Sequence, residues 1–323
     1  MLKFVIQEFK LKSYFGVMFH HFHGEKHPVQ QGSLSVDQLN FILEGLCSRF
    51  NLLNAHEFEA RLVDKKLQPE DICLTFDDAL RCQFDIALPV LQKWGIKGFF
   101  FIYSSPFFGD PDKLEIFRYF RCTKFSSIDD FYAKFFEQAE KNFSTTICQS
   151  KKVYDEDQYL ALFPFYSKND KWFRFLRDEV LGKDNYEMLM TEMMDQIGFN
   201  SNEISNLLWM GPNEIANLRD LGHTIGLHSF SHPHSMAKLS EEEQKLEYHK
   251  NFNHLLNALD KRPTSMSHPS GSYSKATLRI LGDLGVKVGF RSSYGNGNSR
   301  TDLEIPREDS TNILKFFSAS SNL

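Results

Sequence analysis

Two hydrophobic patterns alternate along most of the chain. Longer stretches carry apolar residues at helical spacing, and the short runs between them are rich in β-branched and aromatic residues, which is typical of strands. The runs that predict strands are Tyr14–Phe19, Ile72–Phe76, Gly98–Tyr103, Thr224–Leu227, Thr264–Ser267 and Val286–Phe290. Strands that alternate with helices favour a parallel sheet built from βα units. The pattern therefore predicts an α/β fold.

Helix start signals support this alternation. Ser35 is followed three residues later by Gln38, and Ser240 is followed by Glu243 at the same spacing. Each pair predicts a capping box, in which two side chains satisfy backbone N–H groups at the start of a helix. Apolar residues follow both pairs at helical spacing. These helices are expected to lie between strands.

Residues 107–208 interrupt the alternation, because they are helical in period and dense in Phe, Tyr and Met. Phe131 and Phe135 fall on one predicted helical face, and Tyr186 and Met190 fall on another. The pattern predicts a helical insertion at 107–208 within an α/β body formed by residues 1–106 and 209–323. Its aromatic residues form either a small core or an exposed surface, and such a surface could bind substrate or a second copy of the chain.

Composition narrows the partners and the compartment. The chain has 323 residues and a net charge of −5, which disfavours nucleic acid as a partner. No apolar run is long enough to span a membrane, and residues 1–12 lack the apolar stretch of an export signal. The five cysteines form no C-x-x-C pair and are odd in number, which disfavours a disulfide scaffold. A cytoplasmic location is the simplest expectation.

Two adjacent carboxylates, Asp77 and Asp78, follow the predicted strand Ile72–Phe76 directly. Chemistry in α/β proteins gathers at the carboxyl ends of strands. A bound cation there can hold one carboxylate as a ligand while its neighbour accepts a proton. The alternative is an ordinary helix N-cap with a first-turn charge.

Two histidines, His228 and His232, follow the predicted strand Thr224–Leu227. Four residues apart on one helical turn, both rings could reach one cation, although an H-x-x-x-H also occurs by chance on surfaces. Together with Asp78 they predict a site of two histidines and one carboxylate, which leaves positions open for water and substrate. Zn suits these ligands best, and Co, Ni, Fe or Mn could replace it.

Two further segments could reach the same edge of the sheet. Backbone N–H groups around Pro269, Ser272 and Tyr273 could face a developing oxyanion, although an ordinary Pro-Ser-Gly turn is the simpler interpretation. The first predicted strand ends in His20, His21 and His23, and at least one of these rings is expected at the site.

These residues lie in segments that resemble, in order, those of the polysaccharide deacetylase family, also called the NodB-homology family. The similar segments are Met18–His20, Thr75–Asp78, Leu88–Leu91, Gly98–Ile102, His228–His232 and Pro269–Tyr273. The resemblance implies a distorted (β/α) barrel. It also implies Asp77 as catalytic base and Asp78, His228 and His232 as metal ligands. In such a barrel, loops after strands emerge on the catalytic face, so the insertion is expected to shape substrate access.

The chain departs from the family at three places. Ala79 stands where the family usually has Gly, which is tolerable if its φ is negative. The family's base-orienting arginine is missing from Pro269–Tyr273, and Arg307 is the candidate replacement. No late Leu-x-His-Asp segment supplies the usual acid histidine, so His20, or otherwise His268, is expected to protonate the leaving amine.

The resemblance implies removal of an N-acetyl or other acyl group from an amino sugar or glycan precursor. Without an export signal, a nucleotide-linked or lipid-linked sugar is the expected substrate. Two alternatives stay open: an amidase or deformylase that acts on a small non-glycan substrate, and a catalytically silent sugar-binding protein of the same fold.

Overall fold

A computed structural model of the protein describes residues 13–160, 166–295 and 301–320. The segment 1–12, in which an export signal was sought, lies outside these residues. The chain folds into two compact units. The first combines Met1–Asp112 with Ser205–Leu323, and the second is Lys113–Ile204.

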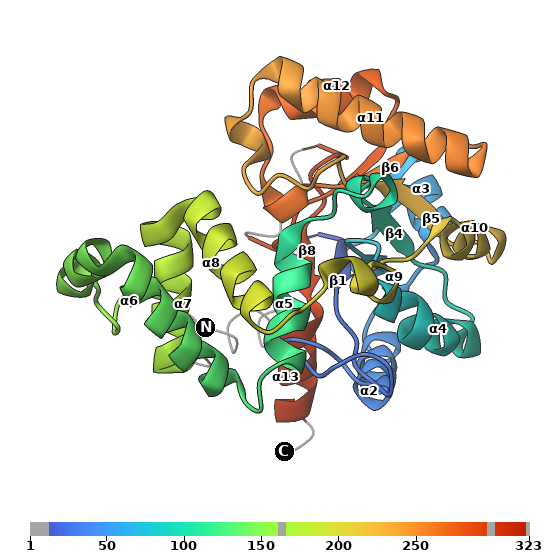
Figure 1. The fold of residues 1–323 in the computed structure, drawn as a ribbon. Coiled ribbons are helices and arrows are strands. Elements are labelled where there is room, and N and C mark those ends of the chain that lie inside the picture. The colour runs from blue at the N-terminus through green and yellow to red at the C-terminus, as the bar shows by residue number, and fades with distance from the viewer. Residues whose placement is uncertain (1–12, 161–165, 296–300, 321–323) are drawn as a thin grey trace. The chain divides into compact units, whose positions relative to one another are not determined.

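The first unit is built on a parallel sheet in the order β7-β6-β5-β4-β3-β1-β8, with β2 paired to β3 (Figure 1). An isolated parallel bridge between Phe290 and Ile305 links β7 to the segment before β8 and nearly closes the sheet into a barrel. The predicted (β/α) barrel is therefore confirmed. The strands are β1 (Phe15–Phe19), β2 (Asn51–Leu52), β3 (Asp71–Phe76), β4 (Phe99–Ile102), β5 (Thr224–Leu227), β6 (Ser265–Ser267), β7 (Val288–Phe290) and β8 (Arg307–Asp309).

All the strands expected from the hydrophobic pattern are present, with shifts of at most two residues at their ends. Two observed strands, β2 and β8, were not expected. β2 is only two residues long, and β8 consists of Arg307, Glu308 and Asp309, so neither carries an apolar pattern. β8 forms because its backbone pairs with β1, in the register Val17 to Glu308.

Helices connect the strands, and both expected capping boxes are present, at Ser35 with Gln38 and at Ser240 with Glu243. The helices of the first unit are α2 (Val36–Cys47), α3 (Ala55–Val63), α4 (Leu88–Trp94), α9 (Ser205–Leu208), α10 (Pro212–Asp220), α11 (Glu241–Leu259), α12 (Lys275–Asp283) and α13 (Ser310–Ser320). Short 3₁₀ or π segments add η1 (Gln83–Ala87), η2 (Ser105–Phe108), η5 (Met236–Lys238) and η6 (Pro269–Gly271).

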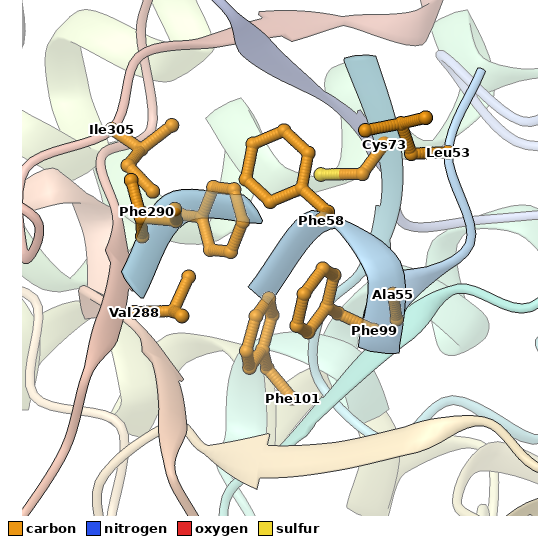
Figure 2. Close-up of a cluster of buried hydrophobic side chains, with 10 residues drawn as sticks. Leu53, Ala55, Phe58, Cys73, Phe99, Phe101, Val288, Phe290 and Ile305 are labelled. Carbon is orange, nitrogen blue, oxygen red and sulfur yellow. The ribbon is translucent and has the colours of Figure 1, made fainter. Parts of the chain in front are cut away.

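The barrel interior is filled mainly by aromatic side chains. Figure 2 shows Phe58 of α3 beside Phe99 and Phe101 of β4 and Phe290 of β7, and all four are fully buried. The Phe58 ring meets the Phe99 ring edge-on, with centroids 6.2 Å apart. Edge-on aromatic pairs of this kind add about 0.5–1.5 kcal/mol beyond their area burial. This core holds the strands in place below the polar groups at their carboxyl ends.

The alternation of strand side chains determines which residues reach the barrel interior. Along β3, inward positions pass from Cys73 through Thr75 to Asp77, so the same face changes from apolar to charged at the strand's carboxyl end. Two glycines make room for this interior. A Cβ at Gly16 would lie 3.1 Å from the Phe290 ring, and one at Gly226 would lie 2.6 Å from Ser265 Oγ.

The second unit has a core of its own. Its elements are α5 (Lys113–Thr123), α6 (Ile128–Val153), α7 (Lys168–Phe175), η3 (Leu176–Leu181), α8 (Gly182–Gln196) and η4 (Ser201–Ile204). Phe131, Phe135 and Phe173 are buried against one another and against Tyr186. The expected helical faces of the insertion therefore pack within the unit. Its role in substrate access stays a prediction.

Within the described residues no helix has the length and hydrophobicity needed to cross a membrane. None of the five cysteines, all of which lie in the described part of the chain, forms a disulfide.

Buried neutral histidines are expected to make the fold sensitive to acid. Burial, with a contribution from Lys97, lowers the pKa of His223 to about 4, well below the ordinary value near 6.5. The unfolded chain takes up this proton first, so stability is complete above pH 6.5 and is lost as pH falls toward 4. When the pH is lowered from 7.5 to 4.5, this histidine is expected to reduce the free energy of unfolding by about 2–3 kcal/mol.

Urea denaturation of two variants at both pH values tests this expectation. In His223→Asn the amide oxygen can still accept the Gly98 N–H, and the pH-dependent loss should shrink by about 2 kcal/mol. His56, which is exposed, offers the control. Between the two pH values, His56→Asn should lose as much stability as the unmodified protein loses. Equal losses in all three proteins would contradict the assignment.

Candidate metal centre

Three predicted ligands meet at the carboxyl end of the barrel. One ligand atom each from Asp78, His228 and His232 lies within 4.8 Å of the others. Asp78 Oδ1 is 3.2 Å from His228 Nε2 and 3.5 Å from His232 Nε2. Asp78 follows β3 and the histidines follow β5, so strands far apart in sequence bring them together. Two imidazoles and a carboxylate that converge in this way could hold a divalent cation.

The histidines do not lie on a helical turn, so that expectation was wrong. They belong to a loop in which Ser229 (φ 64°) and His232 (φ 56°) adopt the left-handed conformation. Such residues turn the chain sharply, and here they bring the two rings to a centroid distance of 4.9 Å. The same spacing of four thus places both rings together through a tight loop.

Side chains of α11 support this loop. Glu247 Oε2 accepts the backbone N–H groups of Phe230 and Ser231, at 2.9 and 2.8 Å, and its Oε1 accepts the Ser231 hydroxyl at 2.7 Å. Asn251 accepts the backbone N–H of His228 at 3.0 Å. Nothing in the sequence pattern singled out Glu247 or Asn251, because both lie among the ordinary polar positions of a helix.

Hydrogen bonding prepares these groups for a cation. The Nδ1 of His228 donates to the Ser267 carbonyl at 2.8 Å, so in the neutral ring the Nε2 lone pair points toward Asp78. Asp78 Oδ1 is buried and makes no hydrogen bond within the described part of the chain. Two lone pairs that face each other repel unless a cation or proton lies between them. The ligand set therefore fits a metal ion.

A carboxylate outside the triad approaches His232. Asp112 Oδ2 lies 3.6 Å from His232 Nδ1 and 3.8 Å from His234 Nε2. Burial opposes a charge on His232, but Asp112 and Asp78 outweigh it and raise the pKa of His232 to about 9. The field around this ring thus favours positive charge. Neither Asp112 nor His234 stood out in the sequence, since both lie outside the matching segments.

Asp77 is held by a buried arginine. Arg307 Nη1 donates to Oδ1 at 2.8 Å and Nη2 to Oδ2 at 2.7 Å, and Nη2 also contacts Ser267 Oγ at 2.7 Å. Burial alone would raise the pKa of Asp77, but the Arg307 charge reverses the shift and the pKa is lowered. The carboxylate stays ionised near neutral pH. Arg307 therefore lies where the missing base-orienting arginine was expected.

The backbone at Asp78 and Ala79 is left-handed, with φ of 77° and 56°. The condition under which Ala79 would be tolerated without strain, a negative φ, is therefore not met. A left-handed residue other than glycine costs about 1–2 kcal/mol. The turn directs Asp78 toward the histidines, and the buried methyl group of Ala79 occupies the place where the family usually has no side chain.

Of the two candidate acids, only His20 reaches the site. Its Nε2 lies 3.8 Å from Asp77 Oδ2 and 3.9 Å from Asp78 Oδ2, and its side chain is 31% exposed. His268 is fully buried, and its Nε2 hydrogen-bonds the Leu303 carbonyl at 2.8 Å. Burial lowers the pKa of His268 to about 3. His268 is therefore excluded as the acid, because it is neutral and inaccessible.

The expected oxyanion segment begins with a short 3₁₀ turn at Pro269. The backbone N–H of Ser272 donates to the Pro269 carbonyl at 2.9 Å, and Ser272 Oγ accepts the Ala237 N–H at 3.1 Å. The Tyr273 hydroxyl donates to Glu304 at 2.9 Å. Since the Ser272 N–H is occupied within the turn, this structure does not offer it to a substrate. The wider role of the segment stays a prediction.

Fold and site together define a class of protein, a parallel (β/α) barrel with a candidate metal centre at the carboxyl ends of its strands. The resemblance that the motifs indicated is confirmed: the polysaccharide deacetylase family model matches residues 185–289. This range includes the His228–His232 loop and the Pro269–Tyr273 segment, whereas Asp77 and Asp78 lie outside it. No curated protein matches the chain.

Several solved structures, a deacetylase and a de-N-acetylase among them, share the fold. The Streptococcus pyogenes deacetylase PplD, solved in complex with acetate, is 14% identical, with a TM-score of 0.52 over 94% of this chain and 96% of that one. IcaB from Ammonifex degensii is 13% identical, with a TM-score of 0.52 over 94% and 97%. A de-N-acetylase from Aggregatibacter actinomycetemcomitans is 11% identical, with a TM-score of 0.53 over 94% and 99%. At these identities the similarity shows the fold.

Removal of the Arg307 charge is expected to destabilise the protein. In Arg307→Met the Asp77 carboxylate stays buried without its guanidinium, which should cost about 3–5 kcal/mol in urea denaturation at pH 7. Because protonation of Asp77 relieves an unpaired charge, the loss should be smaller at pH 4. Arg279→Met, at an exposed pair with Glu241, is the control and should leave stability nearly unchanged. Equal effects of the two changes would contradict a structural role for the Arg307 pair.

Proposed function

We propose that this chain is a metal-dependent deacetylase that removes an N-acetyl group from an amino sugar or glycan precursor. One observation carries the proposal: adjacent carboxylates have separate surroundings, Asp78 beside two imidazoles and Asp77 beside a guanidinium. Such a division lets one carboxylate bind a cation while the other accepts a proton. The family match and the shared fold of solved deacetylases support the same reaction class.

Asp78, His228 and His232 would hold the cation. When bound, a divalent ion would lower the pKa of a water molecule and polarise the acyl carbonyl. Zn is the ion we propose, because two imidazoles and one carboxylate suit it, and Co, Ni, Fe or Mn are the alternatives.

Asp77 acts as the base in this proposal. Its two oxygens are aligned by the paired N–H groups of Arg307, and Ser267 Oγ lies 3.1 Å from Oδ2. The guanidinium keeps the carboxylate ionised and fixes its orientation, so the remaining lone pairs can accept a proton from the attacking water.

His20 supplies the proton for the departing amine. Its partly exposed ring lies on the same side of the site as Asp77 and Asp78, within 4 Å of both carboxylates. This position replaces the histidine of the absent Leu-x-His-Asp segment. The Tyr273 region would stabilise the oxyanion, and the second unit would shape access to the centre.

The purified chain, loaded separately with each candidate metal, provides the test. Free acetate would be measured with N-acetylglucosamine oligomers, a nucleotide-linked N-acetyl sugar and simple acetyl amides, and free formate would be measured with simple formyl amides. The proposal expects metal-dependent acetate release from the sugars and none from Asp77→Asn. Release from simple amides alone would favour the amidase or deformylase alternative, and sugar binding without release would favour the silent sugar-binding protein. Activity on the nucleotide-linked sugar in preference to oligomers would support a precursor substrate. The cytoplasmic location stays a prediction.

A further inference from the structure

A pocket lies at the amino ends of the barrel strands. It has a volume of about 480 Å³ and is formed within the first unit by α3, the end of α10, and the segments that lead into β5, β6 and β7. Thr224 begins β5 on this side, whereas His228 follows the other end of the same strand. With a rise of about 3.3 Å per residue, the pocket and the candidate metal centre lie roughly 13 Å apart along the strand.

Positive charge predominates in this pocket. Its lining includes four cationic side chains, Arg219, Lys261, Arg262 and Lys287, and two acidic ones, Glu59 and Asp64. Asp64 pairs with Lys66 at 2.9 Å, and Arg219 pairs with Asp220 at 2.8 Å. Among the described residues neither Lys261 nor Lys287 has a carboxylate within ion-pair distance. Two exposed ammonium groups are therefore available to a ligand.

Two buried donors in the same lining have no partner within the described residues. His223 is 3% exposed, and its Nδ1 accepts the Gly98 N–H at 3.1 Å, so the proton of the neutral ring lies on Nε2. That Nε2 makes no hydrogen bond, and neither does Thr224 Oγ1, in a residue that is 7% exposed. A buried donor without an acceptor costs about 1–3 kcal/mol, so two such donors in the lining of one pocket favour an acceptor that binds there.

We propose that this pocket binds a phosphate group, either as inorganic phosphate or carried by a small molecule. A phosphate offers several acceptor oxygens and a charge near −1.5 to −2. The His223 Nε2–H and the Thr224 hydroxyl would donate to its oxygens from the buried end, and Lys261 and Lys287 would balance its charge from the open end. The site needs none of the residues proposed for deacetylation.

Isothermal titration of the full chain with inorganic phosphate, glucose 6-phosphate and glucose tests the proposal at fixed ionic strength. Saturable binding of both phosphates in the millimolar range or below is expected, and glucose should not bind. Tighter binding of the sugar phosphate would identify a phosphorylated metabolite as the ligand class, and equal binding would identify the phosphate group itself. Absence of saturable phosphate binding up to about 10 mM would overturn the proposal.

Four variants test whether phosphate binds in this pocket. The double variant Lys261→Gln/Lys287→Gln should raise the Kd for phosphate at least about tenfold. Thr224→Val, which replaces the hydroxyl by a methyl group, should raise it several-fold. Exposed Lys93 lies outside the pocket, so Lys93→Gln is the matched charge control and should bind normally. Because phosphate could also bind a metal, His232→Ala is included and should keep phosphate binding. Loss in His232→Ala, or no loss in the double lysine variant, would overturn the proposal.

Discussion

Replacement of Asp77 by Asn is expected to remove nearly all deacetylation while the metal stays bound. Asn has almost the same volume, but its amide cannot accept the proton of the attacking water, and loss of a general base costs about 10²–10⁴-fold in kcat. One guanidinium hydrogen bond survives at the amide oxygen, whereas Arg307 loses its charge partner. The variant should therefore be less stable by roughly 3 kcal/mol, yet folded at assay temperature.

Acetate release, metal content and urea denaturation of the same preparation separate these effects. Asp110, which is exposed near the end of η2, provides the control, and Asp110→Asn should keep activity, metal and stability. If Asp77→Asn turned over an established substrate at the normal rate, Asp77 would have no part in the mechanism. If it lost metal together with activity, Asp77 would belong to the ligand set.

The apolar pattern predicted the strands of the α/β fold, because buried strands consist of continuous apolar runs. The barrel itself was expected from the family resemblance. β3 and β4 consist largely of Ile, Leu and Phe, and the predicted limits of β5 are identical to the observed ones. β8 was missed for the opposite reason. Its charged side chains serve the site and its neighbours, so it carries no apolar pattern, although Arg307 itself had been noticed as a candidate.

The candidate site was predictable where chemistry follows a strand end. Asp77, Asp78 and His228 fall directly after recognised strands, and the shared barrel edge brings them together. The loop geometry was not predictable from spacing, because an H-x-x-x-H reads as one helical turn although Ser229 and His232 are left-handed. His268 was a candidate acid because it follows a predicted strand. Its position in the sequence does not reveal that its ring is buried and hydrogen-bonded to the Leu303 carbonyl.

Residues that position the site residues could not be recognised from the sequence. Glu247 and Asn251 lie on α11 at the positions that face the histidine loop, and Asp112 reaches His232 from a segment without a regular element. Their role depends on tertiary distance alone. The pocket around His223 was missed likewise, because its lining comes from the amino ends of several strands, where functional side chains were not sought.

Replacement of His232 by Ala is expected to empty the candidate metal centre. The change removes one of three protein ligands and leaves Asp78 and His228, so the affinity for zinc should fall by more than about 100-fold. Ala is somewhat less favoured than His in the left-handed conformation of position 232, but Glu247 and Asn251 hold the loop by hydrogen bonds to other residues, so it should stay folded. Competition with a chromogenic chelator measures this affinity directly and does not depend on turnover.

His234 makes the matched comparison, because it lies two residues further along the same loop, also approaches Asp112, and has no place in the triad. His234→Ala should therefore bind zinc within about threefold of the unmodified protein, whereas His232→Ala should not compete with the chelator. Asp78→Asn should behave as His232→Ala does, since an amide oxygen is a weaker ligand than a carboxylate. Stoichiometric zinc in both His232→Ala and Asp78→Asn would show that the cation binds elsewhere. Loss of zinc in His234→Ala alone would move the centre toward Asp112, and the division of labour between Asp77 and Asp78 would then have no basis.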